Sequence, residues 1–241
     1  FRGPDMRRAP FSFLGADMGG MDAWFREFGA DALAFGASAV LVAIYYAILL
    51  RRTRRDPTSS IHGVNELARS LWVRNVMANP GKDVMAVQTL RNFVMGASLM
   101  ATTAAFLILG TLTLTGQAES ISRSWHVSSG FGSSSAELWI FKVLCLLAVF
   151  ITAFFAFAMA IRLANHVVFM VNVPGPWSHS ALTPEGVADR LNGAGRNFAT
   201  GMRAFFFAVP LVFWLFGPLF LVAATVGLVF ALHRIDRTAA V

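Results

Sequence analysis

Charged side chains are scarce in this sequence: 14% of its 241 residues are Asp, Glu, Lys or Arg, and 56% are apolar. An ordinary soluble domain has about 25% charged residues and about 45–50% apolar ones. A chain with so little charge cannot cover a surface that faces water. The composition therefore excludes a disordered, collagen-like or disulfide-rich secreted protein and indicates an integral membrane protein.

Cysteine and histidine are also rare. The single cysteine, Cys145, excludes an intramolecular disulfide and a thiolate metal cluster. The five histidines form no i, i+4 pair and no HExxH motif. Only His166 and His233 lie near the ends of long apolar stretches, and the predicted topology places them at opposite faces, which disfavours haem ligation. We therefore expect no metal, no cofactor and no enzymatic activity.

Long uncharged stretches alternate with basic segments, and each is close to the roughly 20 residues that cross a hydrocarbon core about 30 Å thick. The segment 143–161 has one polar side chain, Thr152, so it has no face suited to water. We expect an all-α fold: an integral membrane four-helix bundle that forms a single domain over residues 31–237. The predicted spans are residues 32–50, 92–115, 140–162 and 204–232.

The two ends of the chain fall outside this domain. Residues 1–30 contain Gly, Asp and Met with only isolated aromatic side chains, and such a segment has too little apolar surface to fold alone. We expect it to be an N-terminal extension on the non-cytoplasmic side. Residues 238–241 form a short tail.

Lys and Arg gather in the connections after the first and third predicted spans, which predicts that these connections face the cytoplasm. Four spans then place both termini on the non-cytoplasmic side. The basic run after the first span suits anchoring at anionic lipid headgroups rather than nucleic-acid binding. We expect a multi-pass protein of the bacterial inner (cytoplasmic) membrane, with lipids and no nucleic acid among its partners. The interfacial anchors are Arg51, Arg52, Arg54, Arg55 and Trp72.

Two short amphipathic helices are expected in the cytoplasmic connections. Apolar residues recur at helical spacing in 60–77, and again in 184–199. Thr183 is a suitable N-cap for the second helix, and Pro184 suits the first helical position. We expect both helices to lie at the headgroup level of the membrane.

Small residues and prolines mark two of the spans. The spacing of Ala97, Ala101 and Ala105 favours close approach between helices in a membrane. Pro210 and Pro218 each remove a backbone hydrogen bond from the fourth span, so we expect kinks there. Such breaks mark substrate sites in some transporters, and packed bundles also tolerate them.

Two rows of polar residues lie at the expected cytoplasmic margin, one on the second span and one on the third. The spacing places each row on one face of its helix. The rows are either a structural layer of hydrogen bonds between helices or a binding site for a lipid phosphate or another anion, since guanidinium groups bind such groups in bidentate fashion. The candidate residues are Gln88, Arg91, Asn92, Arg162, Asn165 and His166.

Several segments resemble a membrane protein family known as domain of unknown function 599. The longest is DVMAVQTLRNFVMGASLMATT (83–103), and the others include FAFAMAIRLANHVVFMVNVP (155–174) and LHRID (232–236). The resemblance implies a four-span protein of a kind common in proteobacteria with relatives in plants. It implies no particular activity, because none is established for the family. The family's recurrent polar residues match Gln88, Arg91, Asn92, Arg162 and His166.

Two functions remain open. The first is a non-catalytic accessory subunit or assembly factor of a larger inner-membrane complex, which contacts other membrane subunits through residues 1–30 and Phe-rich helix faces. The second is a small-solute or ion transporter or channel that acts as an oligomer. The spans have no ionisable residue near their centres, which disfavours an ion-coupled pump. The Phe-rich faces contain Phe150, Phe154, Phe155, Phe157 and Phe205–Phe207.

Overall fold

A computed structural model of the chain describes residues 12–55, 61–79, 81–116 and 136–237. Of the long first helix, the side chains of residues 28–51 are described. These parts contain six α-helices, one 3-10 turn and no strand, so the expected all-α fold is confirmed for them. The helices are α1 (Ser12–Arg55), α2 (Ile61–Met77), α3 (Asp83–Gly116), α5 (Ala136–Met170), α6 (Pro184–Trp214) and α7 (Pro218–Arg237), and the turn is η2 (Ser180–Leu182).

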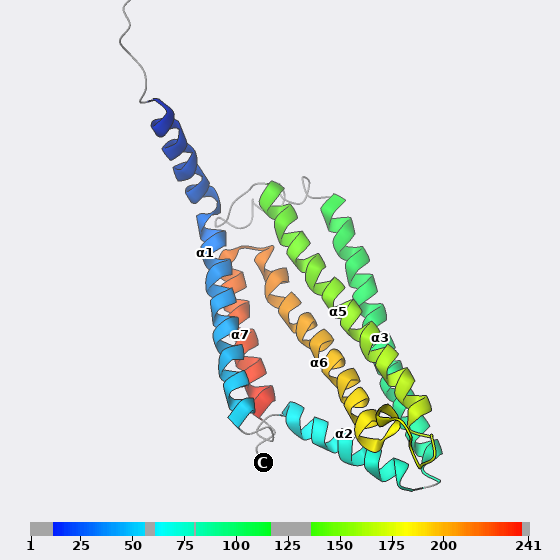
Figure 1. Ribbon diagram of the computed structural model, residues 1–241. Helices are drawn as coiled ribbons and strands as arrows, with labels where there is room; N and C mark the ends of the chain where they lie inside the picture. Colours follow the sequence, from blue (N-terminus) through cyan, green and yellow to red (C-terminus); the bar gives the residue numbers. More distant parts are fainter. Residues whose placement is uncertain (1–11, 56–60, 80, 117–135, 238–241) are drawn as a thin grey trace, which may run out of the picture.

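Five of these helices are long and apolar enough to cross a membrane, namely α1, α3, α5, α6 and α7. Figure 1 shows them side by side and roughly antiparallel, with α7 between α1 and α6, while α2 lies across one end. We call the end beside α2 the inner end and the opposite end, where α6 meets α7, the outer end. Successive long helices therefore run between these two ends in alternating directions.

The expected single span over residues 204–232 is wrong, because the chain turns back in its middle. Helix α6 ends at Trp214, and α7 begins at Pro218. Gly217 between them has a φ of +146°, which residues other than glycine rarely adopt. Pro218 has no backbone N–H with which to continue a helix. Pro218 thus starts a new helix rather than kinking an old one, whereas Pro210 lies inside α6.

The expected separate helix over residues 184–199 is also wrong, since this segment is the first half of α6. The capping prediction holds: Thr183 Oγ1 accepts a hydrogen bond from the Gly186 N–H over 3.3 Å, and Pro184 occupies the first turn. The apolar side of the segment packs on neighbouring helices instead of on lipid headgroups. Its buried residues include Val187, Ala188 and Leu191, which lie in one core with residues of α2, α3 and α5.

Five crossing helices change the expected placement of the termini. Figure 1 shows the inner end of α7 close to the inner end of α1, while α1 begins at the opposite end of the molecule. If all five helices cross the membrane, the two ends of the chain lie on opposite sides of it. The expectation that both termini share one side rested on a count of four spans.

The centre of the bundle is packed with small and aromatic side chains. Ala97, Ala101 and Ala104 are buried on α3, so the close-packed stripe includes two of the predicted alanines, while Ala105 is only partly buried. Gly201 on α6 faces the ring of Phe157 on α5, and a Cβ atom built there would lie 2.7 Å from the ring. The absence of a side chain at Gly201 is what lets α6 approach α5 this closely.

Candidate functional site

A buried ion pair lies near the outer end of the bundle. Lys142 on α5 and Asp31 on α1 approach to 2.7 Å between Nζ and Oδ1, and their side chains are 7% and 1% exposed. Trp214, the last residue of α6, donates a hydrogen bond from Nε1 to the same Oδ1 over 2.7 Å. The Lys142 ammonium also lies 5.3 Å from the centre of the Trp214 ring. Asp31 therefore joins α1 to both α5 and α6.

The distance of this pair from the outer end of α5 follows from the position of Lys142 in that helix. Lys142 is six residues beyond the first residue of that helix, which corresponds to about 9 Å of rise. The second carboxylate oxygen, Asp31 Oδ2, is buried and has no hydrogen-bond partner among the described residues. Buried carboxylate oxygens are nearly always hydrogen-bonded, so Oδ2 is an exception among the described residues.

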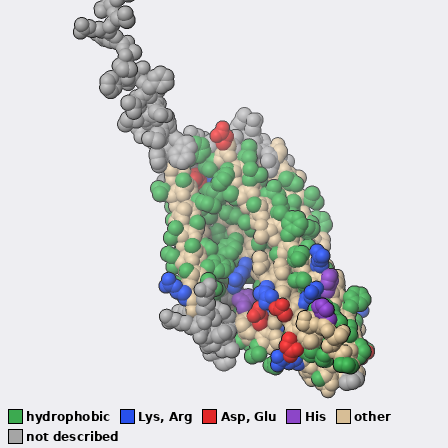
Figure 2. All heavy atoms as spheres, in the orientation of Figure 1, with side chains coloured by type: hydrophobic (Ala, Val, Ile, Leu, Met, Phe, Trp, Pro, Cys, Tyr) green, Lys and Arg blue, Asp and Glu red, His purple; other side chains and the backbone are tan. Residues whose placement is uncertain are grey.

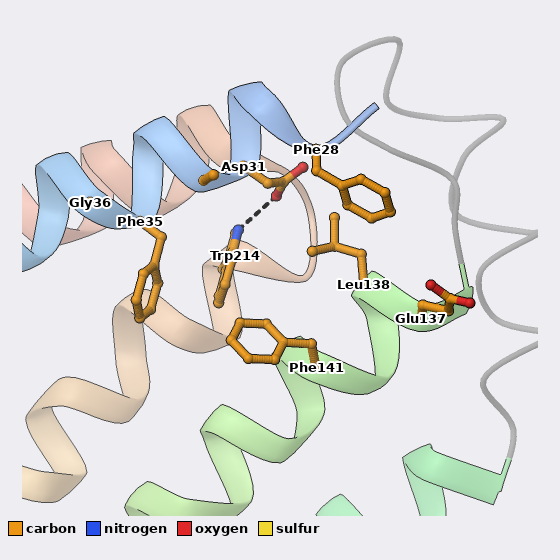
Figure 3. A pocket seen from close by; sticks show the side chains of 9 residues that line it. Phe28, Asp31, Phe35, Gly36, Glu137, Leu138, Phe141 and Trp214 are labelled. Carbon is orange, nitrogen blue, oxygen red and sulfur yellow. Dashed lines mark hydrogen bonds between the residues drawn. The ribbon is translucent and has the colours of Figure 1, made fainter. Parts of the chain in front are cut away.

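Beside the pair is a cavity of about 500 Å³, which we call the outer groove. Helices α1, α5 and α6 supply its walls, and Figure 3 shows the Phe35 and Phe141 rings on either side of Trp214, whose N–H is bonded to Asp31. The rings of Phe35 and Trp214 stack with 5.0 Å between their centres, and Phe141 meets Trp214 edge-on at 6.1 Å. The groove is lined by Phe28, Asp31, Ala32, Phe35, Gly36, Glu137, Leu138, Phe141 and Trp214.

At the inner end, hydrogen bonds between polar side chains join α2 to α6. Arg69 donates from Nε to Asn192 Oδ1 over 2.8 Å, and Asn192 donates from Nδ2 to Ser70 Oγ over 3.0 Å. Burial lowers the pKa of the Arg69 guanidinium; Glu66 opposes this shift and Arg196 adds to it. These bonds hold α2 against the bundle.

Further ion pairs surround this contact. Arg196 lies 3.1 Å from Glu66 Oε1 and 3.6 Å from Asp189 Oδ1, so it bridges α6 to α2. Arg203 Nη2 lies 2.7 Å from His62 Nε2, and its guanidinium lies over the Tyr46 ring of α1 at 5.4 Å. Figure 2 shows the charged side chains gathered at this end, with a mainly hydrophobic surface above them.

The six predicted polar residues are all exposed, on the inner parts of α3 and α5. His166 is paired: its Nδ1 lies 3.3 Å from Arg190 Nη1 of α6. No hydrogen bond joins the α3 row to the α5 row within the described part of the chain. Arg190 instead belongs to a second cavity of about 570 Å³ at the inner end, lined by Leu163, Ser180, Ala181, Gly186, Asp189, Arg190, Gly193 and Arg196.

The other sequence predictions concern anchors and aromatic faces. Arg51 is exposed at the inner end of α1, and Trp72 is partly buried on α2, while the side chains of Arg52, Arg54 and Arg55 lie outside the described residues. Phe155 is exposed, but Phe150 and Phe157 are buried between α5 and α6, so they do not belong to an outward Phe-rich face. Residues 1–11 of the N-terminal extension lie outside the described part.

Asp31, Lys142 and Trp214 were not among the predicted site residues. The sequence carries a signal for the first two, because each directly precedes a long uncharged stretch. Two opposite charges at the same depth on different helices are candidates for an ion pair. Within the described residues, no group of three His, Cys, Asp or Glu side chains is placed to hold a metal ion.

The family comparison agrees with the resemblance seen in the sequence. A family model described as "Protein of unknown function, DUF599" matches residues 33–241. The chain belongs to the DUF599 family. No curated protein and no solved structure matches it. Lys142 and Trp214 fall inside the range matched by DUF599, and Asp31 lies two residues before it.

Proposed function

We propose that this DUF599 protein is a non-catalytic membrane protein that serves as an accessory subunit or assembly factor of a larger complex in the bacterial inner membrane. The observation that carries the proposal is the apolar centre of the bundle. Between the inner polar cluster and the outer ion pair, the core consists of residues such as Ala104, Ala153, Phe157 and Ala208. A path for a polar solute needs polar or ionisable groups along its length, and the described residues of these two core clusters are all apolar.

The distribution of charge supports an inner end that faces the cytoplasm. All described Lys and Arg side chains except Lys142 lie at or near the inner end. The positive-inside rule assigns such an end to the cytoplasm. In this orientation α7 ends on the cytoplasmic side, α1 begins on the other side, and α2 lies along the cytoplasmic surface with Leu67 and Leu71 exposed toward the headgroups.

Helices α1 and α7 offer a surface for a partner. Leu33 is 76% exposed and Phe230 is 63% exposed, and Val40, Ile44 and Val226 are also more than half exposed. Lipid covers such residues in a solitary protein, and the helices of another subunit cover them in a complex. We further propose that residues 1–30 contribute to this contact on the non-cytoplasmic side.

The test is mild detergent extraction of the full chain from its native membrane, followed by native mass measurement. We expect a stoichiometric assembly larger than the chain alone. Removal of residues 1–27 should release the partner, while a chain with the same 27 residues in scrambled order serves as the control for length and composition. A protein that migrates alone in all three forms, and that moves a solute across liposomes, would contradict the proposal.

Transport is the second candidate, because one observation favours it. Asp31 and Lys142 are buried in the outer half of the bundle, and ionisable residues inside membrane proteins often line ion or solute paths. A transporter that uses them also needs a polar path past Phe157, either through a rearrangement of α5 and α6 or between copies of the chain. Solute flux that disappears in the double variant Asp31→Leu with Lys142→Met, which leaves no buried charge unpaired, would support this candidate over the first.

A further inference from the structure

The second cavity, between α5, η2 and α6, has the dimensions of a ligand site, and we call it the inner groove. Its volume of about 570 Å³ lies within the roughly 300–1,000 Å³ that ligand pockets occupy. One wall is formed by η2 packed directly on α6, because a Cβ atom at Gly186 would collide with the Ser180 carbonyl. Thr183 Oγ1 donates a hydrogen bond to the same carbonyl over 2.8 Å, which fixes the turn beside the groove.

The inner groove lies at the depth where α5 leaves the apolar part of the bundle. Leu163 in its wall follows Arg162, the residue that ends the uncharged stretch 143–161. These 19 residues rise by about 28 Å in a helix, close to the thickness of a hydrocarbon core. Figure 2 shows Lys, Arg and His side chains gathered on the surface at this end. The groove is therefore at the level of lipid headgroups and also within reach of soluble molecules.

Most of the charges around the inner groove balance one another. Arg196 in its wall lies 3.1 Å from Glu66 Oε1 and 3.6 Å from Asp189 Oδ1. Arg69 is also close enough to Glu66 for the carboxylate to act on its pKa. Two guanidinium groups thus face two carboxylates, and this set leaves no excess charge.

Arg190 in the same wall is the cation that these carboxylates do not neutralise. Within the parts of the chain that the structure describes, its one hydrogen bond is between Nη1 and His166 Nδ1, over 3.3 Å. A guanidinium can only donate, so this imidazole nitrogen accepts and adds no charge. The contact leaves Nε and Nη2 of the half-buried Arg190 available as donors, and the Ser180 hydroxyl lies in the wall of the same groove.

An anion with several oxygens fits this arrangement. A guanidinium group donates two parallel hydrogen bonds to phosphate or carboxylate oxygens, and such charge-assisted bonds are about twice as strong as neutral ones. A bare phosphate is too small to fill the groove, so the anion should carry a further polar part. Phosphate esters meet both conditions.

We propose that the inner groove binds a phosphate ester, with Arg190 donating hydrogen bonds to the phosphate oxygens while the rest of the polar group fills the space between η2, α5 and α6. An anionic lipid headgroup and a soluble phosphate ester share this chemistry. The proposal does not depend on the accessory role, because one chain supplies all the walls of the groove.

The experiment measures binding to the purified full chain in an uncharged detergent by equilibrium dialysis, corrected for uptake by protein-free micelles. The probes are dihexanoyl phosphatidylglycerol, dihexanoylglycerol, which has the same chains and no phosphate, and glycerol 3-phosphate, which has no chains. We expect the phospholipid to bind about tenfold more tightly than dihexanoylglycerol. Equal binding of these two probes would overturn the proposal.

Glycerol 3-phosphate distinguishes the two sources of the phosphate. If it binds at least as tightly as the phospholipid, the groove takes a soluble phosphate ester. If it binds more weakly, the acyl chains contribute, and the groove takes a lipid headgroup.

A charge-removing variant tests the role of Arg190. Arg190→Gln should lower the affinity for the phospholipid about tenfold, because it removes the guanidinium donors. Arg74→Gln is the matched control: it removes the same charge from an exposed position at the inner end, outside the groove. Equal affinities of the two variants would reduce the binding to a general attraction between basic surface and anion, and would contradict the proposal.

A groove-filling variant tests the place of binding. A Cβ atom at Gly193 would lie 3.4 Å from Leu163 Cδ1, at the end of a flexible side chain, so Gly193→Leu should fill the groove after a small adjustment. Gly110→Leu on α3 is its control, because a Cβ atom there meets nothing within 4 Å. We expect only Gly193→Leu to weaken phospholipid binding. Unchanged binding by Gly193→Leu, at the same thermal midpoint as Gly110→Leu, would place the ligand elsewhere and refute the assignment.

Discussion

The two ends of the bundle handle charge in opposite ways. At the outer end a single ion pair is almost fully buried, and one of its carboxylate oxygens has no partner in the described structure. At the inner end many charges are present, and most of them are exposed: the Arg74–Glu185 pair has side chains 58% and 64% exposed. Exposed pairs contribute little to stability, whereas a buried pair is costly to break and requires both partners.

This comparison separates two roles. The inner cluster holds α2 on α6 with many small contributions, and most of the described Lys and Arg side chains lie at this end. The outer pair ties α1 to α5 and α6 through one carboxylate, which lies beside an apolar groove. Substitutions at the two ends should therefore differ in both size and kind of effect.

The largest effect is expected for Lys142→Met. The substitution leaves the Asp31 carboxylate buried and without its counter-charge, which costs about 3–5 kcal/mol. The thermal midpoint in detergent and the accumulation of the protein should both fall. Adding Asp31→Leu to the same chain should restore most of the loss, and a double variant as unstable as Lys142→Met would show that the pair is not what matters.

A smaller but clear loss is expected for Gly201→Ala. The new Cβ atom would lie 2.7 Å from the Phe157 ring, so α5 and α6 must separate or the ring must move, at a cost of about 1–3 kcal/mol. Gly96→Ala on α3 is the control, because its Cβ atom meets nothing within 4 Å. Thermal denaturation of the two variants side by side measures the difference, and equal midpoints would count against the close packing of α5 and α6.

Next in size is Asn192→Ala at the inner end. This change removes the acceptor for Arg69 and the donor to Ser70, so it should destabilise the protein by about 1–2 kcal/mol. A double-mutant cycle with Arg69→Ala should give a coupling energy well above experimental error. Additive effects of the two substitutions would mean that the hydrogen bond between Arg69 and Asn192 contributes no stability.

The smallest effect is expected for Arg74→Ala. Its pair with Glu185 spans 3.4 Å on the exposed surface, so its loss should change stability by less than about 1 kcal/mol. The small difference should shrink further at high salt, because exposed charges are screened. A loss as large as that of Asn192→Ala would show that the two ends differ less than their burial indicates.

Much of the fold follows from the sequence. The main error of the sequence-based prediction, a single span over residues 204–232, has a local cause. The uncharged stretches locate α1, α3 and α5, and Thr183–Pro184 marks the start of α6. The first two thirds of α6 contain Arg190, Arg196 and Arg203, so the composition of this part resembles a surface helix although the helix continues to Trp214. The Gly217–Pro218 pair is a turn signal, but the sequence is apolar on both sides of it, so the whole stretch resembles one span.

The candidate site was less predictable, for a different reason. Helical spacing identifies polar residues on the same helix, as it does for Arg162 and His166, but it gives no information about which helices are neighbours. Asp31 and Lys142 are 111 positions apart, and their contact depends on how α1 packs against the rest of the bundle. Only the three-dimensional arrangement brings Lys142 and Trp214 to the carboxylate of Asp31.

The most direct test of this account is the side of the membrane on which the α6–α7 turn lies. Single cysteines at Ser180→Cys, Phe216→Cys and Arg234→Cys, in a Cys145→Ala background, are exposed to a membrane-impermeant thiol reagent in intact cells. Five spans predict labelling at Phe216→Cys, while Ser180→Cys and Arg234→Cys label only after the membrane is opened. Protection of Phe216→Cys together with labelling of Arg234→Cys in intact cells would restore a single span over 204–232 and contradict the account.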